Sequence, residues 1–147
     1  MSAGMSTSFP LDWMRVRFAG TTNVGKKRDH NEDAYYLPKT ERRAIVADGM
    51  GGHASGEVAS HLAVEVISRV YYEAEGDAHA ALREAVRQAN REIFRAGSEK
   101  ESLKGMGTTC VALAVKGGQA YCAHVGDSRL YVVRDGQIYQ LTEDHSA

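Results

Sequence analysis

Two neighbouring helical segments lie between two groups of strand segments, and this order constrains the fold more than any other feature of the sequence. Apolar residues recur every four positions from residue 58 to 70, and a second apolar face runs from residue 81 to 96. Strands and helices that come in runs, without strict alternation, indicate an α+β fold with helices stacked on antiparallel sheet. Because 147 residues suit one domain, we expect a single folded unit.

The two helical segments carry the residues that helix ends prefer. Ser55 is placed to cap the first helix, and Gly76 is placed to end it. Asp77 then caps the second helix, and Gly97 is the expected stop.

Alternating or compact apolar runs predict the strands. The expected strands are residues 13–19, 34–37, 43–47, 108–116, 119–124, 130–134 and 137–142. Gly-Gly at 117–118 and Asp-Gly at 135–136 are two-residue hairpin turns. The first turn sets a register in which Cys122 faces Leu113 and Cys110 falls on the opposite face, which argues against a disulfide.

The second hairpin is apolar on both faces, with leucine, valine, isoleucine and tyrosine alternating along residues 130–141. A sheet that is apolar on both sides is covered on both sides. We therefore expect helices on one face of the sheet and a second sheet on the other.

Composition excludes several classes of function. The formal net charge is −1, whereas a nucleic-acid-binding protein usually has a basic excess. Two cysteines are too few for a disulfide framework or a cysteine-rich zinc site. No apolar stretch approaches the ~20 residues of a membrane helix, and residues 1–18 do not form a secretory signal, so we expect no membrane insertion and a cytoplasmic location. Residues 1–12 are small and polar, and we expect a disordered tail before a domain that begins at residue 13.

Three clusters of acidic residues lie at the edges of expected strands. They are Arg28-Asp29-His30-Asn31-Glu32-Asp33, Asp48-Gly49 and Gly126-Asp127-Ser128-Arg129. Loops at the ends of strands are where binding residues concentrate. The sequence therefore directs attention to these three segments.

Asp48 directly follows an apolar strand and opens a glycine-rich loop into a helix. Its carboxylate could bind a hard cation, and Gly49 would let its own carbonyl turn toward the same ion. Taken alone, Asp-Gly is more typical of a simple turn than of a metal site, whereas a phosphate-binding loop would need a Lys and a Ser or Thr that this loop lacks. Asp127 alone is typical of a turn residue, and Arg28 alone is typical of a solvated basic patch.

Four segments together resemble the metal-dependent type 2C Ser/Thr protein phosphatase family in its bacterial form. They are residues 20–36, 44–60, 105–113 and 123–146. The resemblance runs from about Val16 to the end of the chain. It implies an antiparallel β-sandwich flanked by α-helices, of the α/β/β/α type, with residues 13–147 forming the N-terminal part of a catalytic domain that is incomplete on its C-terminal side.

The resemblance also implies a metal centre with two Mn²⁺ or Mg²⁺ ions, and a third ion in bacterial members. Asp48 matches the aspartate that bridges the two ions, and Gly49 matches the glycine whose carbonyl binds one of them. Asp33 matches an aspartate beside the metal pair, and Glu32 matches the acidic residue that holds metal-bound water. Asp127 matches the aspartate that helps to bind the third ion.

The implied activity is hydrolysis of phosphoserine and phosphothreonine in proteins by a metal-activated water, without a covalent enzyme intermediate. Arg28 matches the arginine that grips the substrate phosphate, so the expected catalytic residues are Arg28, Glu32 and Asp33. Thr108 falls in a threonine motif beside the metal centre. The implied partners are phosphorylated proteins that are substrates of a Ser/Thr kinase.

The sequence departs from the family pattern in two places. Met50 stands where some relatives carry a histidine that protonates the leaving group; we interpret His53 and His145 as ordinary loop or surface histidines, with water as the acid. The sequence stops at Ala147, where family members continue and supply two further metal-binding aspartates. Missing strands would leave an exposed sheet edge that favours self-association. The alternatives are a truncated, non-catalytic binding or regulatory module and a hydrolase that acts on small phosphate esters.

Overall fold

An antiparallel sheet forms the centre of the structure, a computed structural model that describes residues 5–11, 14–37, 43–51 and 55–145. Its strands follow the order β3-β4-β6-β7, and the short strand β5 pairs with the end of β4. Their bounds are β3 (Asp33–Tyr36), β4 (Arg43–Met50), β5 (Gly107–Thr108), β6 (Cys110–Lys116) and β7 (Gln119–Val125).

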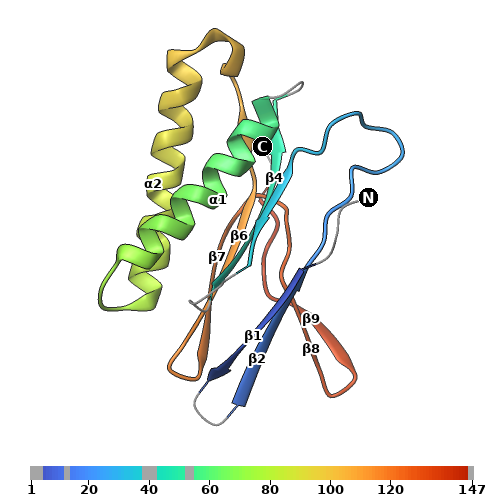
Figure 1. The fold of residues 1–147 in the computed structure, drawn as a ribbon, viewed down its shortest axis with the longest axis vertical. Coiled ribbons are helices and arrows are strands. Elements are labelled where there is room, and N and C mark those ends of the chain that lie inside the picture. Colours follow the sequence, from blue (N-terminus) through green and yellow to red (C-terminus); the bar gives the residue numbers. More distant parts are fainter. Residues whose placement is uncertain (1–4, 12–13, 38–42, 52–54, 146–147) are drawn as a thin grey trace.

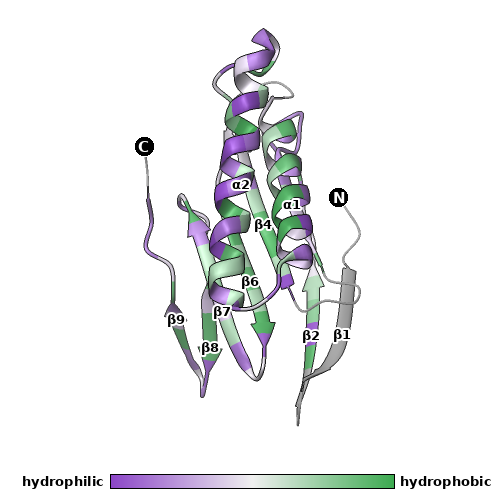
Figure 2. Ribbon diagram, turned by 90° about the vertical axis from the view of Figure 1, so that its left-hand side faces the viewer, coloured by the Kyte–Doolittle hydropathy of each residue, from purple (hydrophilic) through white to green (hydrophobic). Residues whose placement is uncertain are grey.

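Two helices, α1 (Ser55–Glu73) and α2 (Ala78–Glu99), pack on one face of this sheet (Figures 1 and 2). Alternate residues of β4 face the helices, so that Ile45 and Ala47 are buried with Val66 and Ile67 of α1 and Leu82 of α2. Burial of these aliphatic side chains supplies the main stabilising term of the fold. Among the described residues, neither helix combines the length and the apolar character that crossing a membrane requires.

Two separate hairpins lie on the side of the sheet opposite the helices (Figure 1). One consists of β1 (Met5–Leu11) and β2 (Met14–Gly20), and the other of β8 (Tyr131–Arg134) and β9 (Gln137–Gln140). A short 3-10 helix, η1 (Glu101–Leu103), follows α2. The α+β class and the antiparallel sheet are therefore confirmed. The second layer of strands consists of two separate hairpins, and the described residues contain one helical layer.

Arg43 is a buried charged residue at the start of β4, on the helix-facing side of the sheet. Its Nη2 donates hydrogen bonds to Ser68 Oγ at 3.0 Å and to Tyr36 Oη at 3.3 Å. The guanidinium carbon lies 5.0 Å from the centre of the Tyr36 ring, which adds a cation–π contact. These contacts join β4 to both β3 and α1.

The two hairpin turns have the predicted form. Backbone φ is positive at 60° and 77° for the glycines of turn 117–118, and at 52° and 76° for the residues of turn 135–136. Positive φ at both central residues is the geometry of a type I′ turn, which glycine and aspartate tolerate. The Asp77 cap is also confirmed, because its carboxylate accepts a hydrogen bond from the Ala80 amide at 3.0 Å.

Several expectations about element boundaries are wrong, among them the end of the first helix, which lies at Glu73 and not at Gly76. Residues 5–11 were expected in a disordered tail, but they form β1 because the edge of β2 offers a full ladder of backbone partners from Met5↔Gly20 to Leu11↔Met14. The predicted strand 108–116 is divided into β5 and β6. Gly97 does not end α2, which continues to Glu99, where Ser98 Oγ bonds to Phe94 O and the Lys100 amide to Ala96 O.

Among the described residues, the cover expected on both sides of the second hairpin is also incomplete. Val133 is 73% exposed and Ile138 is 67% exposed, and all of β9 is exposed. The described residues supply no further strand that packs on this apolar surface. Self-association through such a surface stays a prediction.

The cysteine register is confirmed, because Cys122 pairs with Leu113 and Cys110 pairs with Val125. Burial raises the pKa of the Cys110 thiol to about 12, and partial burial raises the pKa of the Cys122 thiol. Both cysteines are free.

We expect Cys122 to react with a disulfide reagent well before Cys110, because Cys110 is more deeply buried and the thiolate is the reactive form. The measurement is the time course of thiol labelling in the native chain. A Cys122→Ser variant should leave only the slow phase. Equal labelling rates for the two thiols would contradict this assignment of burial.

Candidate metal centre

Asp33 of β3 and Asp48 of β4 stand directly opposite each other in the central sheet. Both are on the face turned away from the helices, because their neighbours Ala34 and Ala47 are buried on the helix side. Asp48 was expected in a loop, but β4 extends through Gly49 to Met50 because β3 and β5 supply partners on its two edges. The sheet thereby fixes two carboxylates from residues 15 positions apart at one place.

The two carboxyl groups interact directly. Partial burial raises the pKa of Asp33, and a hydrogen bond to the Asp48 carboxyl and its negative charge raise this pKa further. The Arg28 guanidinium acts in the opposite direction. A divalent cation between the carboxylates would remove their repulsion, and carboxylate oxygens are the ligands that Mg²⁺ and Mn²⁺ prefer.

The donor set of this pair therefore fits a hard divalent cation. Within the described part of the chain, no group of three or more His, Cys, Asp or Glu side chains is arranged to hold a metal ion. The described residues thus provide a site with two carboxylates.

A cavity of about 350 Å³ opens beside the pair. Its polar wall includes Thr21, Thr22, Asp33, Asp48 and Ser128, and its apolar wall includes Phe18, Tyr35, Leu37, Ile45 and Val46. The carboxylates therefore face an open space between β2 and the central sheet.

Thr109 fixes the backbone of Asp48. The Asp48 amide donates to Thr109 Oγ1 at 3.0 Å, and the Thr109 amide donates to Asp48 O at 2.9 Å. Thr109 Oγ1 also lies 2.5 Å from Ser128 Oγ, which connects Asp48 to the loop after β7. Thr108, the predicted threonine, pairs with Gly49 through β5.

Glu32 and Asp33 point to opposite sides, as expected for adjacent residues. The Glu32 carboxylate lies against Gly56 in the first turn of α1, and a Cβ built on Gly56 would be 2.7 Å from Glu32 Cδ. The Glu32 carbonyl accepts a hydrogen bond from the Gly49 amide at 3.0 Å. The structure thus brings the predicted residues Glu32, Asp33, Asp48 and Gly49 together.

The other predicted residues lie further out. Arg28 is exposed, yet its charge reaches Asp33. Asp127 is exposed in the loop after β7 and does not line the cavity, although its neighbour Ser128 does. His145 stacks on His124 with ring centroids 5.0 Å apart, and Met50 is exposed. His53 lies outside the described residues.

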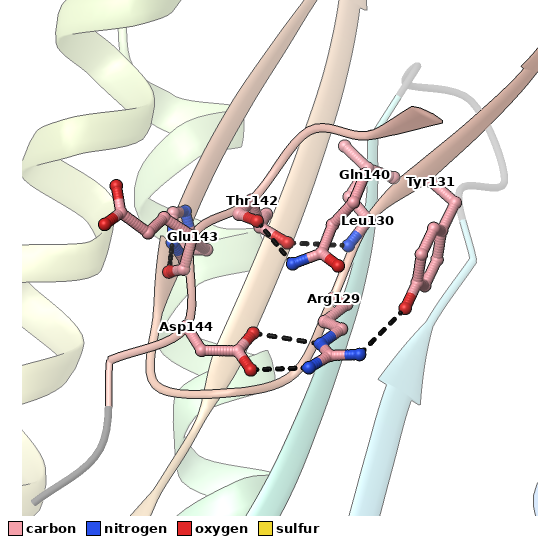
Figure 3. A network of polar contacts seen from close by, with 8 residues as sticks. Arg129, Leu130, Tyr131, Gln140, Thr142, Glu143 and Asp144 are labelled. Atoms are coloured by element: carbon pink, nitrogen blue, oxygen red, sulfur yellow. Dashed lines mark hydrogen bonds and ion pairs between the residues drawn. The ribbon is translucent and has the colours of Figure 1, made fainter. Parts of the chain in front are cut away.

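A polar network that sequence reasoning missed holds residues 141–145 beside the second hairpin (Figure 3). Arg129 binds Asp144 through two hydrogen bonds, Nε to Oδ1 at 2.9 Å and Nη2 to Oδ2 at 2.6 Å. The carboxylate raises the pKa of Arg129, and the guanidinium lowers the pKa of Asp144. Above this pair, the Leu130 amide donates to Thr142 Oγ1 at 3.1 Å. The opposite charges just outside hairpin 130–142 were the available signal, because the turn places them at its base.

We expect Thr109→Val to lower the free energy of unfolding by about 1 kcal/mol, the usual net contribution of a hydrogen bond. The substitution keeps the shape of the side chain and removes the hydroxyl that accepts from the Asp48 amide. Urea denaturation followed by circular dichroism measures the change. Thr109→Ser retains the hydroxyl and is the matched control, so a stability loss in Thr109→Val no larger than that in Thr109→Ser would contradict the assigned hydrogen bond.

We expect Asp33→Asn to raise the thermal midpoint at pH 7 in the presence of a metal chelator. A folded-state pKa above the unfolded-state value means that this group stabilises the fold fully below the ordinary pKa of aspartate, about 4, and that this stability is lost as the pH rises through the raised value. Asparagine cannot ionise, so the variant keeps this contribution at pH 7. Differential scanning fluorimetry should show the difference at pH 7, and it should shrink at pH 3. A variant less stable than the parent at pH 7 would contradict the proposed repulsion.

Comparison with known proteins places this chain in a family. The family model described as Protein phosphatase 2C matches residues 20–147. The chain is 41% identical to the serine/threonine protein phosphatase PstP of Mycobacterium tuberculosis over 130 residues, which cover 88% of this chain and 25% of PstP. It is 39% identical to the serine/threonine phosphatase stp of Listeria monocytogenes over 133 residues, which cover 85% of this chain and 53% of that protein.

A solved structure of a phosphatase relative is also similar to this chain. The catalytic domain of PstP in complex with two manganese ions superposes with a TM-score of 0.77 at 36% identity, and the match covers 97% of this chain and 55% of that one. The chain spans about half the length of the Listeria relative and about a quarter of PstP. The match to the family model over most of the sequence shows that the chain belongs to the protein phosphatase 2C family.

Proposed function

We propose that this chain forms the N-terminal part of the catalytic domain of a metal-dependent protein Ser/Thr phosphatase. The observation that carries the proposal is the pairing of Asp33 with Asp48 across β3 and β4. The pair is exposed to a cavity and fits a hard cation. The phosphatase relatives and the manganese-bound structural neighbour support the same assignment.

Each residue of the site has a proposed role. Asp33 and Asp48 hold Mn²⁺ or Mg²⁺ with the carbonyl of Gly49, as part of a centre of two ions, and Asp127 contributes to a third ion. When bound, the ions supply positive charge that acidifies a water for attack on phosphorus. The Glu32 carboxylate lies against the first turn of α1, so in this proposal Glu32 supports the site through its contacts with Gly49 and Gly56 and does not bind this water.

The chain's own residues also act on the substrate. Arg28 is exposed and its charge reaches Asp33, so its planar guanidinium can bind two oxygens of the substrate phosphate. Met50 has no proton to donate, so the leaving alkoxide takes its proton from water. The proposed substrates are cytoplasmic proteins that a Ser/Thr kinase has phosphorylated.

We expect the folded chain with Mn²⁺ to release phosphate from a phosphothreonine peptide, and Asp48→Asn to lose this activity. The asparagine keeps the hydrogen-bonded backbone but weakens the cation site. Asp135→Asn, in the turn of the second hairpin, is the matched control and should retain activity. Release that persists in Asp48→Asn would contradict the assigned metal centre.

A second candidate is a phosphoprotein-binding module without catalysis. It is favoured by the described residues, among which the candidate site has two carboxylates and no group of three or more metal-binding side chains. Under this alternative, a folded chain would release no phosphate yet would bind a phosphothreonine peptide more tightly than the unphosphorylated peptide. Arg28→Gln should then weaken binding of the phosphorylated peptide alone, as fluorescence anisotropy would measure.

A further inference from the structure

Gly56 is the second residue of α1, a position where glycine weakens a helix relative to alanine. Its backbone conformation does not require glycine, because it is not among the glycines with positive φ. Neither helix propensity nor backbone freedom therefore explains why glycine stands at position 56. The explanation lies in the atoms that surround this position.

The place of a side chain at position 56 is occupied by the Glu32 carboxylate. A Cβ on Gly56 would lie 2.7 Å from Glu32 Cδ and 2.8 and 3.0 Å from the two carboxylate oxygens. Real Cβ atoms essentially never approach other atoms as closely as the first two distances. The carboxylate also gains from the partial positive charge at the N-terminal end of a helix.

The same contact extends to Gly49. The Gly49 amide donates to Glu32 O at 3.0 Å, and a Cβ on Gly49 would lie 1.9 Å from Gly56 O and 2.8 Å from Glu32 O. Three segments thus meet with glycine at two of the three contact positions: the residue before β3, the end of β4 and the first turn of α1. Asp33 directly follows Glu32, and Asp48 directly precedes Gly49.

We infer that Gly56 is a positioning residue of the candidate metal centre. Its missing side chain admits the Glu32 carboxylate to the first turn of α1, and Glu32 in turn holds Gly49, which sets the position of Asp48. This inference rests on the proposed function for the presence of a metal ion. The contact between Glu32 and Gly56 that supports it exists without a metal ion. Gly56 itself touches no substrate or ion in this role.

The two glycines predict different responses to substitution. At Gly49 the obstructing atoms are backbone, so alanine cannot fit without moving α1 or β4. At Gly56 the obstructing atoms are the end of a flexible side chain, so alanine displaces the Glu32 carboxylate and leaves the backbone in place. Gly56→Ala is therefore the selective variant.

A double-mutant cycle of Gly56→Ala and Glu32→Ala tests the inference. In a chelator, Gly56→Ala should lower the thermal midpoint by about 2–4 °C in the parent, the scale of one lost favourable contact in a chain of this size. In the Glu32→Ala background the same substitution should leave the thermal midpoint unchanged, because the carboxylate that obstructs position 56 is absent. An equal loss in both backgrounds would overturn the inference and assign Gly56 to backbone packing.

Mn²⁺ binding, measured by calorimetry, reports whether the contact reaches the site. Gly56→Ala should raise the Kd about 10-fold, the lower end of the effect that residues supporting metal ligands have, and it should add nothing in the Glu32→Ala background. Gly97→Ala, a glycine inside α2, is the matched control and should leave the Kd unchanged. An unchanged Kd in Gly56→Ala would overturn the positioning role.

A parent chain that binds no Mn²⁺ would contradict the proposed function and not the inference. In that case the amide NMR signal of Gly49 tests the inference, because this amide donates a hydrogen bond to Glu32 O. The signal should move in Gly56→Ala and should not move further when Gly56→Ala is added to Glu32→Ala. A Gly49 signal unaffected by Gly56→Ala would overturn the inference.

Discussion

The pairing of β3 with β4 places two like charges directly opposite each other, and the rest of the structure depends on sustaining that arrangement. Facing carboxylates destabilise a sheet. The repulsion between Asp33 and Asp48 is offset by burial of Ala34 and Ala47 beneath them and by the aliphatic core under α1 and α2. The hydrogen bonds of Thr109 hold the same strand from its other edge. A scaffold stabilised on one face of the sheet thereby carries an unfavourable charge pair on the other.

The helices have a second role besides covering the core. The first turn of α1 approaches the end of β4 so closely that Gly49 has no room for a side chain, and Gly56 leaves the room that the Glu32 carboxylate occupies. The Glu32 side chain turns toward this helix while Asp33 turns toward the cavity. One short acidic segment thus connects the helical layer with the open face of the sheet.

Local patterns predicted the parts of the structure that depend on neighbouring residues. The helices, the two glycine-containing turns, the Asp77 cap and the cysteine register follow from spacing within a few residues. The extension of β4 through Met50 could not be predicted in this way, because its partners come from residues 33 and 107–108.

The same distinction applies to the candidate site. Asp48 and Gly49 were recognisable from their place after an apolar strand, and the family resemblance indicated Glu32 and Asp33. Thr109 escaped notice because its role depends on a backbone amide of a distant strand. The Arg129–Asp144 pair escaped notice because it joins two side chains outside the strands, whose backbone ladder already ends at Tyr131↔Gln140. Buried Arg43 has a further consequence, since it lies on the helix side of β4, five residues before Asp48 on the opposite side. A slip of β4 by one residue would exchange the two faces, expel the guanidinium from Ser68 and drive the Asp48 carboxylate into the aliphatic core. A misregistered β4 is therefore destabilised by two groups of opposite charge, the displaced Arg43 guanidinium and the buried Asp48 carboxylate. The residues of the strand that carries the site thus also favour its correct register.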